Sequence, residues 1–125
     1  LNFGHTFGHA LEAETGFGDD LYHGEAVAMG MKLAFELSTH LGFCPREDTA
    51  RACAHLDAVG LPDISSLKGK YKLTAEKLLA HMSQDKKVKN GVITFVLTYG
   101  IGKAFLKQDV DDADLLTILN AALEK

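Results

Sequence analysis

The spacing of apolar and polar residues predicts helices over the first half of the chain. Residues 3–15 repeat with helical spacing up to Gly16, and a second, more apolar stretch covers about 24–41 and ends at Gly42. The apolar face of this second helix is marked by Val27, Met31, Phe35 and Leu41 and widened by Ala28, Met29, Leu33 and Ala34. Because so wide an apolar face is typical of a buried element, we expect this helix to be covered on most sides.

Start and stop signals predict two further helices. Pro45 is typical of a first helical turn and Gly60 of a helix end, which predicts a helix over about 46–59. Thr74 is typical of an N-cap, and the apolar spacing after it predicts a fourth helix over about 75–84.

The credible strand pattern lies near the C-terminus. The segments "VITFVL" (92–97) and "KAFLK" (103–107) predict two short strands joined by a turn. Asp111 or Asp112 is expected to cap a last helix. The inward-facing residues of that helix are expected to be Leu115, Ile118, Leu119 and Ala122. The predicted fold class is therefore mainly α, a helical domain with at most a small β-hairpin.

Composition and charge narrow the class of protein. With 125 residues, 46% of them apolar and 24% charged, the chain fits one globular domain. The net charge of −4 argues against a general nucleic-acid partner, and no apolar run reaches the roughly 20 residues that span a bilayer. Cys44 and Cys53 lack a CxxC spacing, so we expect reduced thiols in a cytoplasmic protein. Because the chain has no initiating Met, we expect it to be a piece of a longer protein.

Histidines beside glycines are the candidate chemistry. Three of the six histidines, His5, His9 and His23, lie in the first 23 residues, and each has a glycine neighbour. His5 and His9 are four residues apart, which places them on one face of a helix, about 6 Å apart along its axis. Imidazole is the commonest protein ligand of zinc, and His23 can fold back onto the same face across a loop. Gly4 and Gly8 would leave room for a substrate or for a neighbouring backbone.

This pattern leaves several interpretations open. His5, His9 and His23 could be three zinc ligands, or two of them could bind metal with a carboxylate while the third transfers protons. They could also be ordinary, partly buried histidines with hydrogen-bonded ring nitrogens. The lysines of "QDKKVKNG" could likewise hold a phosphate or carboxylate, or simply form solvated surface.

Three motifs carry a resemblance to a known family. "LNFGHTFGHALE", "HGEAVAMGM" and "DKKVKNGVITFVL" followed by "GIG" stand in the order found in the C-terminal domain of 3-dehydroquinate synthases. The likeness covers essentially the whole chain, so residues 1–125 resemble the helical metal- and substrate-binding domain of that family. It implies an upstream, Rossmann-like N-terminal domain that binds NAD and is absent from this sequence. The active site would lie in the cleft between the two domains.

The resemblance also implies roles for single residues. His5 and His23 match two zinc (or cobalt) ligands, and the third ligand, a glutamate, would lie upstream of this sequence. His9 matches a histidine that contacts substrate and transfers protons. Asn2 matches a substrate-binding asparagine, and Lys86 is our choice for a basic substrate contact.

The implied reaction belongs to the shikimate pathway. It converts 3-deoxy-D-arabino-heptulosonate 7-phosphate, a phosphorylated keto-sugar acid, to 3-dehydroquinate and phosphate. NAD oxidises one hydroxyl transiently, phosphate is eliminated, NADH reduces the ketone, and an intramolecular aldol step closes the ring. The implied full-length protein is a cytoplasmic homodimer without a nucleic-acid or membrane partner. Within the lysine motif, Lys87 is the alternative to Lys86 as the substrate contact.

Two other functions are compatible with the same motifs. A related sugar-phosphate cyclase would share the histidines but make a different carbocycle. A freestanding helical metal-binding module would carry out no catalysis and would need no upstream domain. An upstream Rossmann sequence in the same reading frame favours the enzyme, whereas a start codon beside Leu1 favours the module.

Overall fold

The computed structural model describes residues 3–15, 23–61, 64–67, 72–88 and 90–124, without the side chains of residues 23 and 88. Within these ranges the elements are α1 (His5–Glu14), α2 (His23–His40), α3 (Arg46–Ala58), the 3-10 helix η1 (Ile64–Leu67), α5 (Ala75–Val88), β1 (Phe95–Thr98), β2 (Ala104–Lys107) and α6 (Asp112–Leu123). The predicted fold, mainly α with a small hairpin, is confirmed. The short helix η1 was not predicted.

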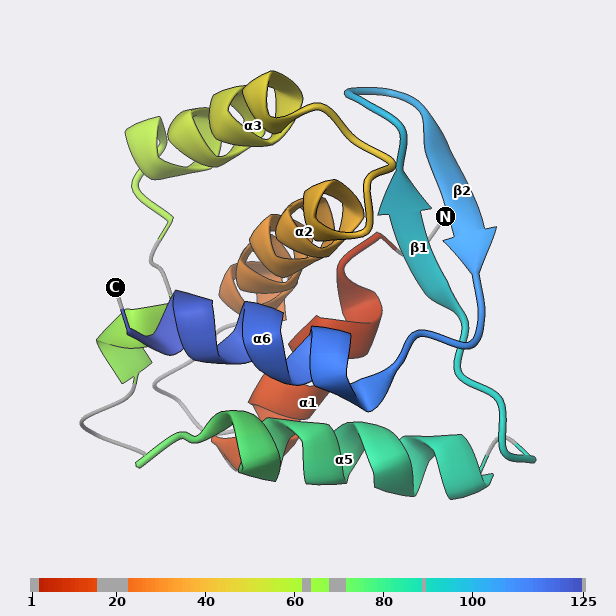
Figure 1. Ribbon diagram of the computed structural model, residues 1–125. Coiled ribbons are helices and arrows are strands. Elements are labelled where there is room, and N and C mark those ends of the chain that lie inside the picture. The colour runs from red at the N-terminus through yellow and green to blue at the C-terminus, as the bar shows by residue number, and fades with distance from the viewer. Residues whose placement is uncertain (1–2, 16–22, 62–63, 68–71, 89, 125) are drawn as a thin grey trace.

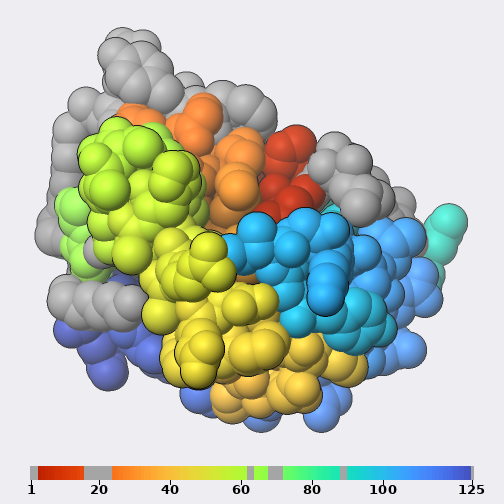
Figure 2. All heavy atoms as spheres, turned by 90° about the horizontal axis from the view of Figure 1, so that it is seen from above, coloured from red at the N-terminus to blue at the C-terminus, as the bar shows by residue number. Residues whose placement is uncertain are grey.

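Helix α2 is the centre of the arrangement (Figure 1). It contacts α1, α3, α6 and β1, while α5 closes the opposite side by packing on α1 and α6. Seen from above, α3 (yellow) and the hairpin (blue) frame the surface parts of α1 (red) and α2 (orange), as Figure 2 shows. The expectation that α2 is covered on most sides is therefore confirmed.

The residues predicted to widen the apolar face of α2, Ala28, Met29, Leu33 and Ala34, are all buried as expected, but the four residues predicted to mark that face are not its most deeply buried row. Val27, Met31 and Leu41 are only half-buried, although Phe35 is buried as expected. The row that points into the core is Ala26, Met29, Leu33 and Leu37. Apolar residues occupy nearly the whole circumference of α2, so their spacing alone does not identify the side that its neighbours cover most fully.

Two helix boundaries also differ from the predicted ones. Helix α1 begins at His5, because Gly4 at its N-cap has the left-handed φ of 81° and cannot belong to the helix. Helix α5 continues to Val88 instead of ending near residue 84. Its end is set by Asn90, whose φ is 59°, and by a hydrogen bond of 2.7 Å from the Gly91 N–H to the Lys86 carbonyl.

The hairpin is attached to α2 by one buried hydroxyl. Strands β1 and β2 are antiparallel, with Phe95 opposite Lys107 and Thr98 opposite Ala104. The Ser38 Oγ accepts a hydrogen bond of 3.0 Å from the Thr98 N–H, and its own hydroxyl donates to the Ala34 carbonyl at 2.7 Å. Ser38 therefore connects the last turn of α2 to the end of β1.

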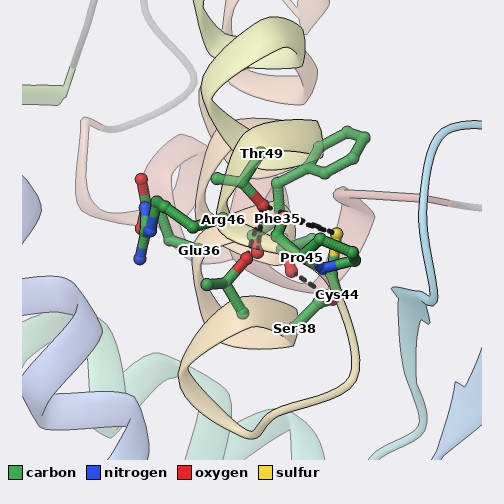
Figure 3. A network of polar contacts seen from close by, with 9 residues as sticks. Phe35, Glu36, Ser38, Cys44, Pro45, Arg46 and Thr49 are labelled. Atoms are coloured by element: carbon green, nitrogen blue, oxygen red, sulfur yellow. Dashed lines mark hydrogen bonds and ion pairs between the residues drawn. The ribbon is translucent and has the colours of Figure 1, made fainter.

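A second polar cluster joins α2 to α3 (Figure 3). The Thr49 hydroxyl donates to the Phe35 carbonyl at 3.1 Å and lies 2.6 Å from the Thr39 hydroxyl. The Cys44 Sγ lies 3.7 Å from the same Thr49 oxygen, and Arg46 pairs with Glu36 on the exposed edge. Cys44 and Cys53 are not joined in a disulfide. The buried Thr49 thus fixes where α3 begins relative to α2.

The last helix, α6, follows the sequence prediction. Asp111 occupies its N-cap, without a side-chain capping bond. Leu115, Ile118 and Leu119 are buried, and Ala122 packs against the same core. In the part of the chain that the structure describes, no helix has the length and apolar character needed to cross a membrane.

Replacing Ser38 by Ala should destabilise the protein by about 1–3 kcal/mol, because the buried Thr98 N–H loses its acceptor. Urea denaturation measures this difference. Thr117→Ala is the matched control, because Thr117 makes the same bond to the carbonyl four residues earlier but is exposed. The control should stay within about 0.5 kcal/mol of the wild type. Equal effects of the two substitutions would contradict a special role for Ser38.

Candidate active site

The two helices that carry the glycine-flanked histidines meet backbone to backbone. A Cβ atom built on Gly30 of α2 would lie 2.1 Å from the Gly4 carbonyl oxygen and 2.9 Å from the Gly8 nitrogen. A Cβ on Gly4 would lie 2.6 Å from the Met31 nitrogen, and a Cβ on Gly8 would lie 3.1 Å from the Ala26 carbonyl oxygen. Gly4 and Gly8 are therefore needed for the close approach of α2, the second of the two uses that the sequence suggested.

This contact places His5 and His9 beside the crossing of the two helices. Their ring centroids are 5.6 Å apart with an interplanar angle of 34°, so the i, i+4 spacing brings them together as expected. His9 is exposed, whereas His5 is half-buried and takes part in an interaction of its own. The exposed His9 ring can therefore meet a bound molecule, whereas the His5 ring is partly covered by the protein.

Two side chains of the predicted site lie outside the described part of the structure. Asn2 precedes the first described residue, and His23 begins α2 but its side chain is not described. The predicted approach of His5 and His23 around one cation therefore stays a prediction. The described backbone is compatible with it, because the contact between α1 and α2 involves the N-terminal half of α2.

An open groove runs beside His9 between α1 and α5. Its empty volume is about 620 Å³. The residues that line it are Thr6, His9, Ala10, Ala13, His81, Met82, Gln84 and Asp85. Ala10 and Ala13 of α1 line the groove beside these polar groups and take up little of its space, because they carry only a methyl group. A molecule bound next to His9 would thus also meet polar groups from α5.

A histidine–carboxylate pair joins the two walls of this groove. The His81 Nε2 of α5 lies 2.6 Å from one carboxylate oxygen of Glu14 at the end of α1. The Lys77 Nζ lies 4.0 Å from the other carboxylate oxygen. The Glu14 side chain is only 17% exposed and the His81 side chain 37%. A carboxylate this buried needs such partners, because burial of an unpaired charge is costly.

Lys86 and Lys87 of the third motif lie on the last turn of α5, where positive charge is favourable for the helix dipole. Lys86 lines a depression different from the His9 groove, shared with Ser83, Gly91 and Asp109. Lys87 is exposed. Neither lysine lines the groove that contains His9 and His81. The sequence prediction located these lysines after the helix, and the longer α5 corrects this.

The described side chains supply only part of a metal site. No group of three or more His, Cys, Asp or Glu side chains within the described residues is arranged to hold a metal ion. The His5 and His9 imidazoles are nitrogen donors of the kind that zinc accepts. The roles of His5 and His23 as metal ligands stay a prediction.

Sequence comparison decides the family. The sequence profile of the family described as "3-dehydroquinate synthase C-terminal" matches residues 1–88. The 3-dehydroquinate synthase of Rhodospirillum rubrum is 58% identical over 124 residues, which cover 98% of this chain and 32% of the relative. The chain belongs to the 3-dehydroquinate synthase family. The enzyme of Caulobacter vibrioides is 52% identical over 95% of the chain, and the chain spans about a third of the length of these curated relatives.

Solved structures show the same fold for this domain. The 2-epi-5-epi-valiolone synthase of Streptomyces hygroscopicus, solved with NAD+ and Zn2+ bound, has a TM-score of 0.83 at 26% identity. The match covers 98% of this chain and 32% of that protein. A 2-deoxy-scyllo-inosose synthase, solved with carbaglucose-6-phosphate, NAD+ and Co2+, has a TM-score of 0.75 at 21% identity. The latter similarity shows a shared fold alone.

The Glu14–His81 pair was not predicted from the sequence. The two residues are 67 positions apart, and neither belongs to a glycine-flanked motif. Only the packing of α1 on α5 brings them together. The one available signal was the period of α5, which places His81 and Asp85 on the same helix face.

Replacing Gly30 by Ala should destabilise the protein by about 3 kcal/mol or more, at the upper end of the overpacking range, because the new methyl group meets backbone atoms that cannot move independently. Thermal or urea denaturation measures the loss. Gly24→Ala is the control within the same helix, because a Cβ there meets nothing within 4 Å. That control should be neutral or slightly stabilising. Similar stability of the two variants would show that the close helix contact is not needed.

Proposed function

We propose that this chain is the metal- and substrate-binding part of a 3-dehydroquinate synthase. The full-length protein would convert 3-deoxy-D-arabino-heptulosonate 7-phosphate to 3-dehydroquinate and phosphate, a phosphate-eliminating lyase reaction that depends on NAD and zinc. The observation that carries this proposal is 58% identity to a 3-dehydroquinate synthase over 98% of the chain, a span that contains almost the whole chain with its histidine and lysine motifs. An assay of the full-length protein with this substrate tests it.

The chain contains part of the binding site that the proposed cofactors need. His5 and His23 would hold the metal together with a glutamate from a Rossmann-like N-terminal domain, which would also bind most of the NAD. Zinc or cobalt would supply Lewis-acid stabilisation of oxyanions, and NAD would supply reversible hydride transfer. A structural relative that contains both NAD+ and Zn2+ supports the same pair of cofactors here.

The remaining roles in the proposed reaction belong to His9, Lys86 and Asn2. The exposed His9 ring is free to contact substrate and to carry protons, and it lies beside His5. Lys86, with Lys87 as the alternative, would hold a phosphate or carboxylate as a point charge at the end of α5. Asn2 would donate or accept a hydrogen bond with a substrate hydroxyl or phosphate. The full-length protein would be a cytoplasmic homodimer.

A related sugar-phosphate cyclase is the second candidate, because the fold is shared with cyclases that act on other substrates. The higher identity to 3-dehydroquinate synthases favours the first candidate. The full-length protein should therefore release phosphate from the heptulosonate phosphate and not from hexose or heptose phosphates that lack the carboxylate. The reverse preference would support the second candidate.

The three histidines should respond differently to substitution in the full-length protein. His5→Ala and His23→Ala should lose the metal, whereas His9→Ala should keep it and lose about 10²–10⁴-fold in kcat, the usual cost of losing acid–base assistance. Metal analysis and steady-state kinetics on the three variants side by side measure this. Full activity of His9→Ala, or metal loss equal to that of the other two, would contradict the division of roles.

The 125-residue chain alone should not convert the heptulosonate phosphate, even with added NAD and zinc. It contains no G-x-G-x-x-G turn between a strand and a helix, so it lacks a recognisable site for the hydride acceptor. Its affinity for zinc should also be lower than that of the full-length protein, because one ligand is missing. Product analysis and calorimetry test both statements, and tight stoichiometric zinc binding by the chain would contradict the second.

A further inference from the structure

A second groove, separate from the one beside His9, lies between α2, α3 and the turn of the hairpin. Its empty volume is about 660 Å³. We call it the Phe35 groove, and the residues that line it are Met31, Phe35, Arg51, Ala52, His55, Leu56 and Ile101. It lies on the face that Figure 2 shows, where α3 and the hairpin flank the surface parts of α2. The described residues of the candidate active site, His5, His9 and Lys86, do not line it.

The lining of the Phe35 groove is mainly apolar. Ile101 is 50% exposed, and Met31 and Leu56 are half-buried. Apolar side chains that gather in an exposed hollow are typical of a surface that contacts another segment or molecule. Arg51 and His55 of α3 are exposed at the same groove and can donate hydrogen bonds. A matching occupant is therefore mainly apolar, with carbonyl or carboxylate oxygens on the side of α3.

The first described residues of the chain lie at one wall of this groove. The Phe3 ring packs edge-on against the Phe35 ring, with the centroids 5.2 Å apart. A Cβ atom built on Gly4, the next residue, would lie 2.6 Å from the Met31 nitrogen and 2.9 Å from the Met31 Cγ. Polypeptide that precedes Phe3 therefore starts beside the groove. An extended chain advances about 3.3–3.6 Å per residue, so a few residues are enough to run along the groove.

The relatives contain additional polypeptide that could fill the Phe35 groove. This chain covers 32% of the Rhodospirillum rubrum enzyme, so about two-thirds of that protein lies outside the match. Because the matching family profile is described as C-terminal, we expect most of that additional polypeptide to precede residue 1. A segment tethered beside the groove binds at an effective concentration that reaches the order of mM for a short linker. A separate molecule lacks this advantage.

We propose that the Phe35 groove binds an apolar segment of the same polypeptide, from the part of the full-length protein that precedes residue 1. Burial of the Met31, Leu56 and Ile101 side chains stabilises this contact, and Arg51 and His55 bind oxygens of the segment. The contact fixes the preceding part of the protein against α2 and α3. This inference goes beyond the proposed function, because it rests on the groove and on the family and not on the reaction.

Photo-cross-linking in the full-length protein identifies the occupant. The photoreactive residue p-benzoylphenylalanine replaces Ile101 in one variant and Leu106 in the control. Leu106 is also on the hairpin and is 61% exposed, but it does not line the groove. We expect the Ile101 variant to form a link to a peptide that precedes residue 1, within a band that has the mass of one chain on a denaturing gel. The Leu106 variant should not form this link.

A charged substitution tests the same contact without a photoreactive group. Ala52 lines the groove and is half-buried, whereas Ala54 of the same helix is exposed and does not line it. In the full-length protein, A52E should lower the melting temperature by about 3 °C or more, because the segment would cover the new carboxylate. A54E should stay within about 1 °C of the wild type. If A52E does not fold, the cross-linking result decides.

Each contrary outcome has a definite meaning. A band with the mass of two chains from the Ile101 variant would assign the groove to a second copy and overturn the proposal. The absence of a link from this variant, or the same upstream link from the Leu106 variant, would also overturn it, as would equal melting temperatures of A52E and A54E. Neither measurement uses activity. A full-length protein that forms the upstream link but is inactive with the heptulosonate phosphate would therefore overturn the proposed function alone.

Discussion

The close contact of α1 with α2 is the constraint on which the rest of the site depends. No side chain separates the two helices where the Gly4 carbonyl meets Gly30, so their distance is set by backbone atoms. Side chains can change rotamer to absorb a small change, but the backbones of two packed helices shift only as whole elements. The backbone positions from which the His5 and His9 side chains extend are therefore fixed to within the tolerance of this contact.

Helix α2 also fixes the positions of the other elements that pack on it. Its N-terminal half holds α1, and its C-terminal half holds the hairpin through Ser38 and α3 through Thr49. Both hydroxyls are buried and fully used, so a register shift of α2 would leave polar groups without partners. One helix thus serves as a common reference for the histidines at one end and the hairpin at the other.

Much of this could be predicted from local sequence signals. Gly42 and Gly60 end their helices as expected, and the i, i+4 spacing of His5 and His9 brings their rings together. Met29 and Leu33 of the deeply buried row of α2 were predicted to lie on its apolar face, but the complete row could not be identified, because α2 is apolar around most of its circumference. The end of α5 depends on the left-handed Asn90, a conformation that the residue type permits but does not require.

The candidate site, like the fold, could be predicted from the sequence only in part. Its motif residues could be named from the sequence, because each stands beside a glycine or in a short recognisable segment. The groove and its Glu14–His81 contact arise only when α5 packs on α1, and no local pattern encodes that packing. Whether Lys86 faces the groove likewise depends on the rotation of α5 about its axis, which residue spacing leaves undetermined.

The two contacts of α1 differ in how far apart along the chain their partners lie, and this orders the assembly of the domain. Gly4 and Gly30 close a short loop, whereas Glu14 and His81 are separated by 67 residues. Short-range contacts form with a smaller loss of chain entropy and therefore form earlier, and a ribosome also delivers α2 before α5. In a nascent chain, α1 would thus be held on α2 before α5 is present to cover Leu11 and the residues around it. During that interval the apolar side of α1 is open to chaperones and to aggregation.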